Sequence, residues 1–267
     1  MKYTIITAED LSNNSNNKKS YLTPAQQKIV HSTPFKSWFG DWTKKSKRNC
    51  SKVLHPETGE PLVCYHGTLA EVKKGFKFNP SFWNKNGSDH GRGFYFIADR
   101  RIARGYAQNR NTKGSIVSVF LNIRKPLDVK AKSIKEINRN DLTRALIRRV
   151  IAIQEGPGKE AYKDSFLSNY VDTYSNSYSY CLSHATNMIL EDSPTIVDIL
   201  AELGNISGSY TDVYKAMNEA FGYDGYINND FNKTGKDVFV CWFPNQIKSI
   251  RNKVFDANKE EIDSFVR

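Results

Sequence analysis

Four residues of this chain have types and spacings that could hold a flat, polar ligand. His66 is followed directly by Gly67, while Tyr95 lies in a glycine-flanked aromatic run and Tyr106 follows it eleven positions later. An imidazole can donate and accept hydrogen bonds, and a glycine backbone can approach a ligand closely because no Cβ blocks it. Two tyrosine rings with a gap between them would form a slot for a planar heterocycle, and a cationic ring would be attracted to both faces.

Each of these residues also has an ordinary structural interpretation. A single histidine is usually a hydrogen-bonded part of the core, and a tyrosine in a strand usually packs against its neighbours. The combination of a histidine, a glycine and two spaced tyrosines is what favours a binding site.

Hydrophobic runs and turn residues predict the elements that position these residues. Residues 61–65 are expected to form a strand that delivers His66 to a turn made by Gly67 and Thr68. Asp99 is expected to cap a helix over residues 100–108. Further strands are predicted at residues 93–97, 115–123, 223–227 and 237–243, with a last strand following residues 244–250.

Helices are predicted at both ends of the first sheet segment. Thr23 and Pro24 have the types expected at the start of a helix, and the aromatic residues Trp38, Phe39 and Trp42 predict a short helix packed on the main domain. A block of helices is predicted later, at residues 141–154, 194–203 and 211–221, with Gly204 and Gly222 ending the last two.

The composition is that of a folded protein with a basic surface. The 267 residues are 39% apolar and 12% aromatic, and the net charge is +11. These values allow one large domain or two small ones and argue against long disorder. The charge reflects either a general basic bias or a polyanionic partner such as a nucleic acid.

The sequence shows no signal for a membrane or a metal. No apolar run reaches the ~20 residues of a membrane span, and the first residues lack the apolar region of a signal peptide. We therefore expect a cytoplasmic protein, or one exported by a route that needs no such signal, without membrane contact. No two cysteines form a C-x-x-C pair, so Cys64 and Cys241 are expected to be reduced core residues and no metal site is expected.

These motifs resemble the His–Tyr class of ADP-ribosyltransferases, which includes the poly(ADP-ribose) polymerases and the diphtheria-toxin-like enzymes. The similarity is greatest to the ADP-ribosyltransferase modules of bacterial and phage polyvalent proteins. It rests on residues 65–68 and 91–96 with Tyr106, and on segments 38–42, 59–63 and 244–249. The resemblance implies an α+β fold, with a split β-sandwich core of the ADP-ribosyltransferase type and a helical insertion.

The resemblance implies NAD as the substrate and a role for each residue of the slot. His66 would hydrogen-bond the ribose on the adenosine side of NAD. The backbone of Gly67, beside Thr68, would hold the nicotinamide carboxamide. Tyr95 would stack on the nicotinamide ring, and Tyr106 would cover its other side.

Three further positions are interpreted by the same resemblance. Arg92 is expected to contact the NAD phosphates. Ala103 stands where many polymerases carry a serine that bonds the carboxamide. Gln246 is expected to be structural rather than catalytic.

The third catalytic position of the family is where this chain departs from the pattern. The polymerases carry a glutamate there, and alignment on residues 244–246 places Val238 at that position, one residue after Asp237. Adjacent strand residues point to opposite faces, so Asp237 could substitute only if the strand is bulged or out of register. An apolar residue there resembles the mono-ADP-ribosylating members. We therefore expect a single transfer, with His66, Tyr95 and Asp237 as catalytic candidates.

Three functions remain open at this stage. The basic residues Arg100, Arg101 and Arg104 favour transfer to RNA or DNA by a toxin or anti-phage effector, which could have an antitoxin or immunity partner. A protein target is the second candidate. The third is a non-catalytic domain of the same fold that binds NAD or nucleic acid.

The chain is expected to divide into five parts. A polar run near the N-terminus predicts a flexible arm, and the change of character after the first strands predicts an inserted helical block. The expected parts are the arm at residues 1–20, the first core segment at 21–130, the helical insertion at 131–222, the C-terminal core strands at 223–253 and a charged tail at 254–267.

Overall fold

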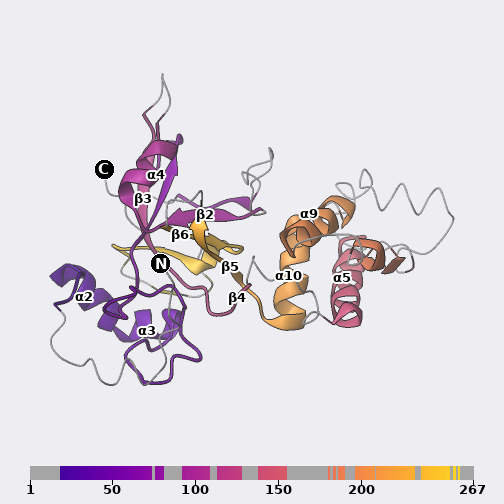
Figure 1. The fold of residues 1–267 in the computed structure, drawn as a ribbon, viewed down its shortest axis with the longest axis horizontal. Coiled ribbons are helices and arrows are strands. Elements are labelled where there is room, and N and C mark those ends of the chain that lie inside the picture. The colour runs from indigo at the N-terminus through magenta and orange to yellow at the C-terminus, as the bar shows by residue number, and fades with distance from the viewer. Residues whose placement is uncertain are drawn as a thin grey trace.

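The computed structural model is built around one seven-stranded sheet with the order β4-β5-β6-β2-β1-β3-β7 (Figure 1). It describes residues 19–73, 76–80, 92–108, 113–127, 138–154, 180, 183–184, 186–189, 196–207, 209–231, 236–252, 255–256 and 258. The strands are β1 (Cys64–Thr68), β2 (Phe94–Ile97), β3 (Ser115–Leu121), β4 (Pro126–Leu127), β5 (Gly225–Phe231), β6 (Lys236–Cys241) and β7 (Ile247–Ser249). Only β4 and β5 pair in parallel among these strands.

The first strand begins later than the sequence predicted. We expected residues 61–65, whereas β1 runs from Cys64 to Thr68 and contains His66 rather than ending before it. The preceding backbone is occupied elsewhere, because the Leu62 N–H donates to the Val53 carbonyl and the Val63 N–H donates to the Tyr21 hydroxyl. His66 and Gly67 are therefore held by strand pairing instead of lying in a turn.

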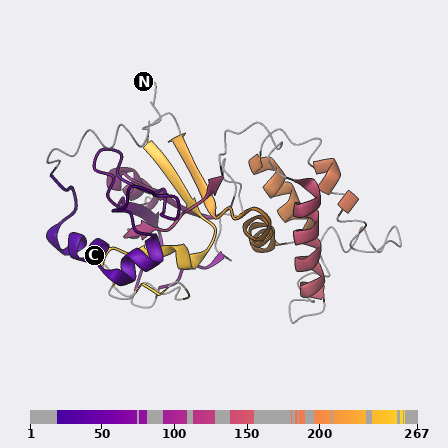
Figure 2. The same ribbon diagram turned by 90° about the horizontal axis from the view of Figure 1, so that it is seen from below.

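Two groups of helices lie on opposite sides of the sheet (Figures 1 and 2). One group is α2 (Pro24–His31) and α3 (Thr33–Phe39), and the other is α5 (Arg139–Gln154), α9 (Ile196–Ser207) and α10 (Tyr210–Phe221). The short α4 (Arg100–Tyr106) packs directly on the central strands. Along the chain the second group lies between β4 and β5, in the segment for which an inserted helical block was predicted.

The local signals for helix ends were mostly correct. Thr23 forms a capping box with Gln26, Asp99 accepts the Arg101 N–H, and Gly222 ends α10 with a left-handed φ of 74°. Gly204 was predicted wrongly as a terminator, since α9 continues to Ser207. A Cβ at Gly204 would lie 2.5 Å from the Tyr210 ring, so this glycine instead allows α9 and α10 to pack closely.

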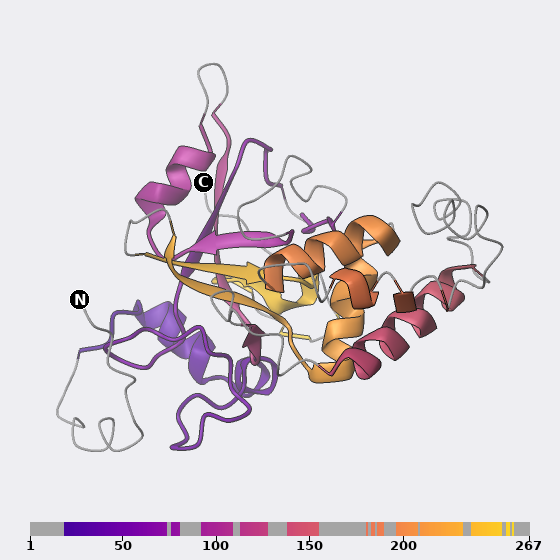
Figure 3. The same ribbon diagram turned by 45° about the vertical axis from the view of Figure 1, so that its right-hand side comes forward.

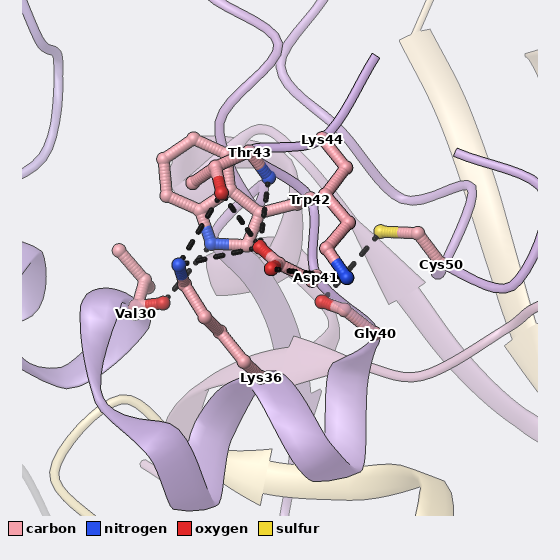
Figure 4. Close-up of polar contacts among 8 residues, drawn as sticks. All are labelled: Val30, Lys36, Gly40, Asp41, Trp42, Thr43, Lys44 and Cys50. Carbon is pink, nitrogen blue, oxygen red and sulfur yellow. Dashed lines mark hydrogen bonds and ion pairs between the residues drawn. The ribbon is translucent and has the colours of Figure 1, made fainter. Parts of the chain in front are cut away.

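The aromatic segment at residues 38–42 is partly helical and partly a turn (Figure 4). Trp38 and Phe39 lie in α3 as predicted, but the helix ends at Gly40, whose φ is 95°. Trp42 lies beyond the helix and donates its indole N–H to the Val30 carbonyl at 3.0 Å. Asp41 holds the turn by pairing with the Lys36 ammonium at 3.2 Å.

The inserted helices share their core with the sheet. Buried side chains of α5, α9 and α10 belong to the same hydrophobic cluster as β6, including Leu146, Leu203, Met217 and Phe239. Figure 3 shows these three helices gathered beside β5 and β6. Stability of the sheet and of the helical block is therefore coupled through one apolar core.

A buried amide joins the two ends of the core, as the structural interpretation of Gln246 predicted. Its Oε1 accepts the Trp242 and Phe243 N–H groups, and its Nε2 donates to the Asn122 and Asp224 carbonyls. Each partner is thereby satisfied around the buried Gln246 side chain.

The cysteines that the structure describes are core residues, as expected for Cys64 and Cys241. Cys50, Cys64 and Cys241 are buried and carry no disulfide, while Cys181 lies outside the described residues, as do residues 1–18 of the expected arm. Within the described part of the chain, no helix is long and apolar enough to span a membrane.

Candidate active site

His66 and Tyr95 are brought together by the pairing of β1 and β2 at the centre of the sheet. The strands are antiparallel, with Tyr65 opposite Ile97, and continuing this register places Gly67 opposite Tyr95. A side-chain contact adds to the pairing, because His66 Nδ1 lies 2.8 Å from the Tyr95 carbonyl oxygen. The two residues from separate sequence motifs therefore form one unit.

The surroundings of His66 determine its protonation. The ring packs against Phe78 and Phe96, with centroid distances of 5.2 and 5.5 Å. Burial lowers the pKa of the imidazole, although the hydrogen bond to the Tyr95 carbonyl opposes this shift. A neutral ring with its proton on Nδ1 donates to that carbonyl and leaves Nε2 as an acceptor, which is suited to a sugar hydroxyl.

Gly67 is the point at which α4 meets β1. A Cβ at this position would lie 1.9 Å from the Ala103 carbonyl oxygen and 3.0 Å from the Tyr106 Cβ. Ala103 is buried, whereas the Tyr106 side chain is 55% exposed at the end of the helix. The close approach places the second tyrosine directly beside Gly67. Thr68 follows at the end of the strand, where its hydroxyl accepts the Ala70 N–H.

Arg92 and Tyr95 lie next to α10 of the helical block, which the sequence did not indicate. The Arg92 guanidinium stacks over the Tyr210 ring at 3.9 Å, and the Tyr214 hydroxyl donates to the Arg92 carbonyl at 2.6 Å. Tyr214 also stacks on Trp242, with ring centroids 4.5 Å apart. The predicted helix at residues 211–221 contained Tyr214 but began one residue after Tyr210. Only the observed start of α10 at Tyr210 places the two tyrosines four positions apart on one helix face.

The two candidates for the third catalytic position, Val238 and Asp237, lie on opposite faces of β6. Val238 is buried and pairs with Ile97, so alternation places it on the sheet face of Tyr95. Asp237 lies on the opposite face, which is the face of His66 and Cys64. Burial raises the pKa of the Cys64 thiol, and the nearby Asp237 carboxylate raises it further.

The backbone beside Asp237 is irregular, which was the condition for this residue to replace a glutamate. Asn228 pairs with Val238 and Phe231 pairs with Lys236, and the register shifts between them. Two residues of β5 therefore lie opposite the single residue Asp237, as in a β-bulge. Bulges of this kind redirect side chains at the ends of strands.

The structure thus brings His66, Gly67 and Tyr95 together, with α4 and its Tyr106 packed against Gly67. A family model described as the ADP-ribosyltransferase in polyvalent proteins matches residues 56–257. The chain belongs to this family, whose activity is the transfer of ADP-ribose from NAD. The match includes the segment of α5, α9 and α10, which the motifs alone did not cover. Comparisons with curated proteins and with solved structures found no match.

The contact between Gly67 and α4 predicts an asymmetry between two glycines. Gly67→Ala should lower the free energy of unfolding by about 2–4 kcal/mol, because the new methyl group would displace the helix backbone. Gly105→Ala is the matched control: no atom lies within 4 Å of its Cβ position inside α4, and alanine should stabilise by up to about 1 kcal/mol. Urea unfolding measures both, and equal effects would contradict this packing.

The lowered pKa of His66 predicts sensitivity to acid. The unfolded chain binds a proton near pH 6.5 but the folded chain does so only at lower pH, so unfolding is favoured as pH falls below that value. This group should contribute a loss of at most about 1.4 kcal/mol per pH unit. Denaturant unfolding between pH 7.5 and 5.5 gives the free energy of unfolding at each pH. This free energy should fall less steeply with decreasing pH for His66→Gln than for the unchanged protein. Identical slopes would show that His66 titrates normally.

Proposed function

We propose that this transferase cleaves the nicotinamide–ribose bond of NAD and transfers a single ADP-ribose to a nucleic acid. The observation that carries the proposal is the hydrogen bond between His66 and the Tyr95 backbone, which joins the two motifs beside Gly67. The arrangement supports NAD recognition through the roles that the family resemblance implies.

In this proposal the slot binds the nicotinamide end of NAD. The Gly67 backbone holds the carboxamide, while the Tyr95 and Tyr106 rings cover the two sides of the nicotinamide. His66 accepts a hydrogen bond at Nε2 from the adenosine ribose, and Thr68 lies beside it. Arg92, held over Tyr210, remains at the start of β2 with guanidinium N–H groups for the phosphates.

The reaction breaks a C–N bond and forms a bond to the acceptor. Nicotinamide leaves with the bonding electrons, the ribose passes through an oxocarbenium-like state, and a nucleophile of the acceptor attacks its anomeric carbon. Asp237 is the proposed carboxylate that stabilises this positive charge or polarises the attacking group, since it shares a sheet face with His66. Buried Val238 at the usual glutamate position favours one transfer over chain elongation.

Nucleic acid is the preferred acceptor because α4 is basic next to the slot. Arg100, Arg101 and Arg104 are exposed on this short helix, which ends at Tyr106. Fixed cations of this kind attract phosphates and raise encounter rates. We propose that the protein acts as a cytoplasmic toxin or anti-phage effector, with an antitoxin or immunity protein as a partner. Transfer to a protein and non-catalytic binding of NAD or nucleic acid are the alternatives.

A labelling experiment tests the acceptor. The protein is incubated with NAD labelled in its ADP-ribose part, together with total RNA, DNA and cell lysate. We expect the label in RNA or DNA, at one ADP-ribose per modified site by mass spectrometry. Label in protein would show that the acceptor is a protein and not a nucleic acid. A polymeric product would contradict single transfer. A folded protein that neither labels a target nor releases nicotinamide would be a non-catalytic binder.

Two substitutions test the proposed site. Tyr95→Ala should abolish measurable nicotinamide release because the stacking surface is lost, while circular dichroism shows a retained fold. Asp237→Asn should lower kcat by about 100-fold, as expected for removing one charge-stabilising group. Asp256→Asn, at an exposed carboxylate, is the control and should keep the unchanged rate. An unaffected Asp237→Asn enzyme would remove this residue from the mechanism.

A further inference from the structure

A separate cavity lies between α4 and β3. It encloses about 550 Å³, and its lining includes Arg100, Arg104, Lys113, Ser115, Ser118 and Ser249. Figure 1 shows α4 beside β3 at one end of the sheet. The proposed NAD residues His66, Tyr95 and Tyr106 do not line it. The volume is in the range of small-molecule sites and is much larger than a single phosphate requires.

The cavity carries an excess of positive charge. Arg100 and Arg104 lie one turn apart on α4, and Lys113 reaches it from the chain before β3. Within the described part of the chain none of these three side chains forms an ion pair. Glu71 is the acidic residue of the lining, and its carboxylate pairs with the Lys73 ammonium at 3.0 Å. The three cations are therefore available to an anion.

The remaining lining combines hydroxyl groups with apolar surface. The Ser115 hydroxyl oxygen accepts the Val72 N–H at 3.2 Å, which leaves its own proton to donate. Val72, Ala107 and Ile116 supply apolar surface in the same cavity. Cations and hydroxyls suit a phosphate, and the apolar part suits a sugar or a base, so the chemistry is that of a nucleotide unit.

The position of the cavity relates it to the slot. Within α4, Ala103 and Tyr106 contact Gly67, whereas Arg100 and Arg104 line the cavity. Ile116 of the lining is the direct cross-strand partner of Gly67. The two sites therefore adjoin along α4 and β1. A strand that places one nucleotide in the cavity would carry its neighbours along α4 towards Tyr106.

We propose that this cavity binds a phosphate-bearing nucleotide of the acceptor strand, with Arg100, Arg104 and Lys113 contacting its phosphodiester. The proposal rests on nucleic acid being the acceptor of the proposed transfer. It assigns α4 a double role, since Ala103 and Tyr106 lie against the proposed NAD slot while Arg100 and Arg104 hold the strand to be modified.

A binding experiment without NAD tests the cavity. The full chain is titrated against a fluorescent single-stranded RNA of about 12 nucleotides, and against DNA of the same sequence, using anisotropy. The Arg104→Gln/Lys113→Gln double variant should bind at least one of these strands about tenfold more weakly at low salt. Between about 50 and 200 mM salt, the slope of log K against log salt should become shallower by about 0.7 for each phosphate that the variant no longer neutralises.

The matched control removes the same charge elsewhere. Lys45→Gln/Arg48→Gln changes two exposed cations remote from α4 in the sequence and should keep the affinity and the salt slope. Equal weakening by both double variants would overturn the proposal in favour of a general basic field. Unchanged binding by the cavity variant would also overturn it, as would displacement of the RNA by inorganic phosphate at equal concentration. Because NAD is absent, a failure of NAD cleavage leaves these outcomes unaffected.

Discussion

The close approach of α4 to β1 at Gly67 is the constraint on which the rest of the site depends. A side chain larger than hydrogen would overlap the Ala103 carbonyl, so the helix can lie on the strand only because residue 67 is a glycine. The helix then places Tyr106 beside Gly67, while Arg100 and Arg104 line the cavity against β3. One steric condition thereby positions residues of the proposed NAD slot and of the basic cavity on the same seven-residue helix.

The helical block contacts the site through residues near β2 and β6. Tyr210 and Tyr214 of α10 hold the side chain and the carbonyl of Arg92, and Tyr214 stacks on Trp242 in the shared core. The start of β2, and with it the position of Tyr95, is therefore tied to residues far along the chain. The helical block therefore helps to fix the position of β2 by packing and hydrogen bonding.

The two faces of β6 offer different side chains at the position where the polymerases carry a glutamate. Val238 on the Tyr95 face is apolar and buried, whereas Asp237 shares a face with His66, opposite an irregular segment of β5. A family glutamate and this aspartate are thus not equivalent by sequence position. Strand alternation separates them, and the bulge in β5 opposite Asp237 is the irregularity on which the proposed role of this carboxylate depends.

Local features of the sequence determined the helix caps at Thr23, Asp99 and Gly222 and the identity of the paired motifs, because these depend on neighbouring residues or on residue type alone. Tertiary structure decided the start of β1, the role of Gly204 and the faces of Asp237 and Val238. It also created the cavity and joined α10 to Arg92. These features depend on cross-strand partners and packing between residues distant in sequence, which no local pattern specifies.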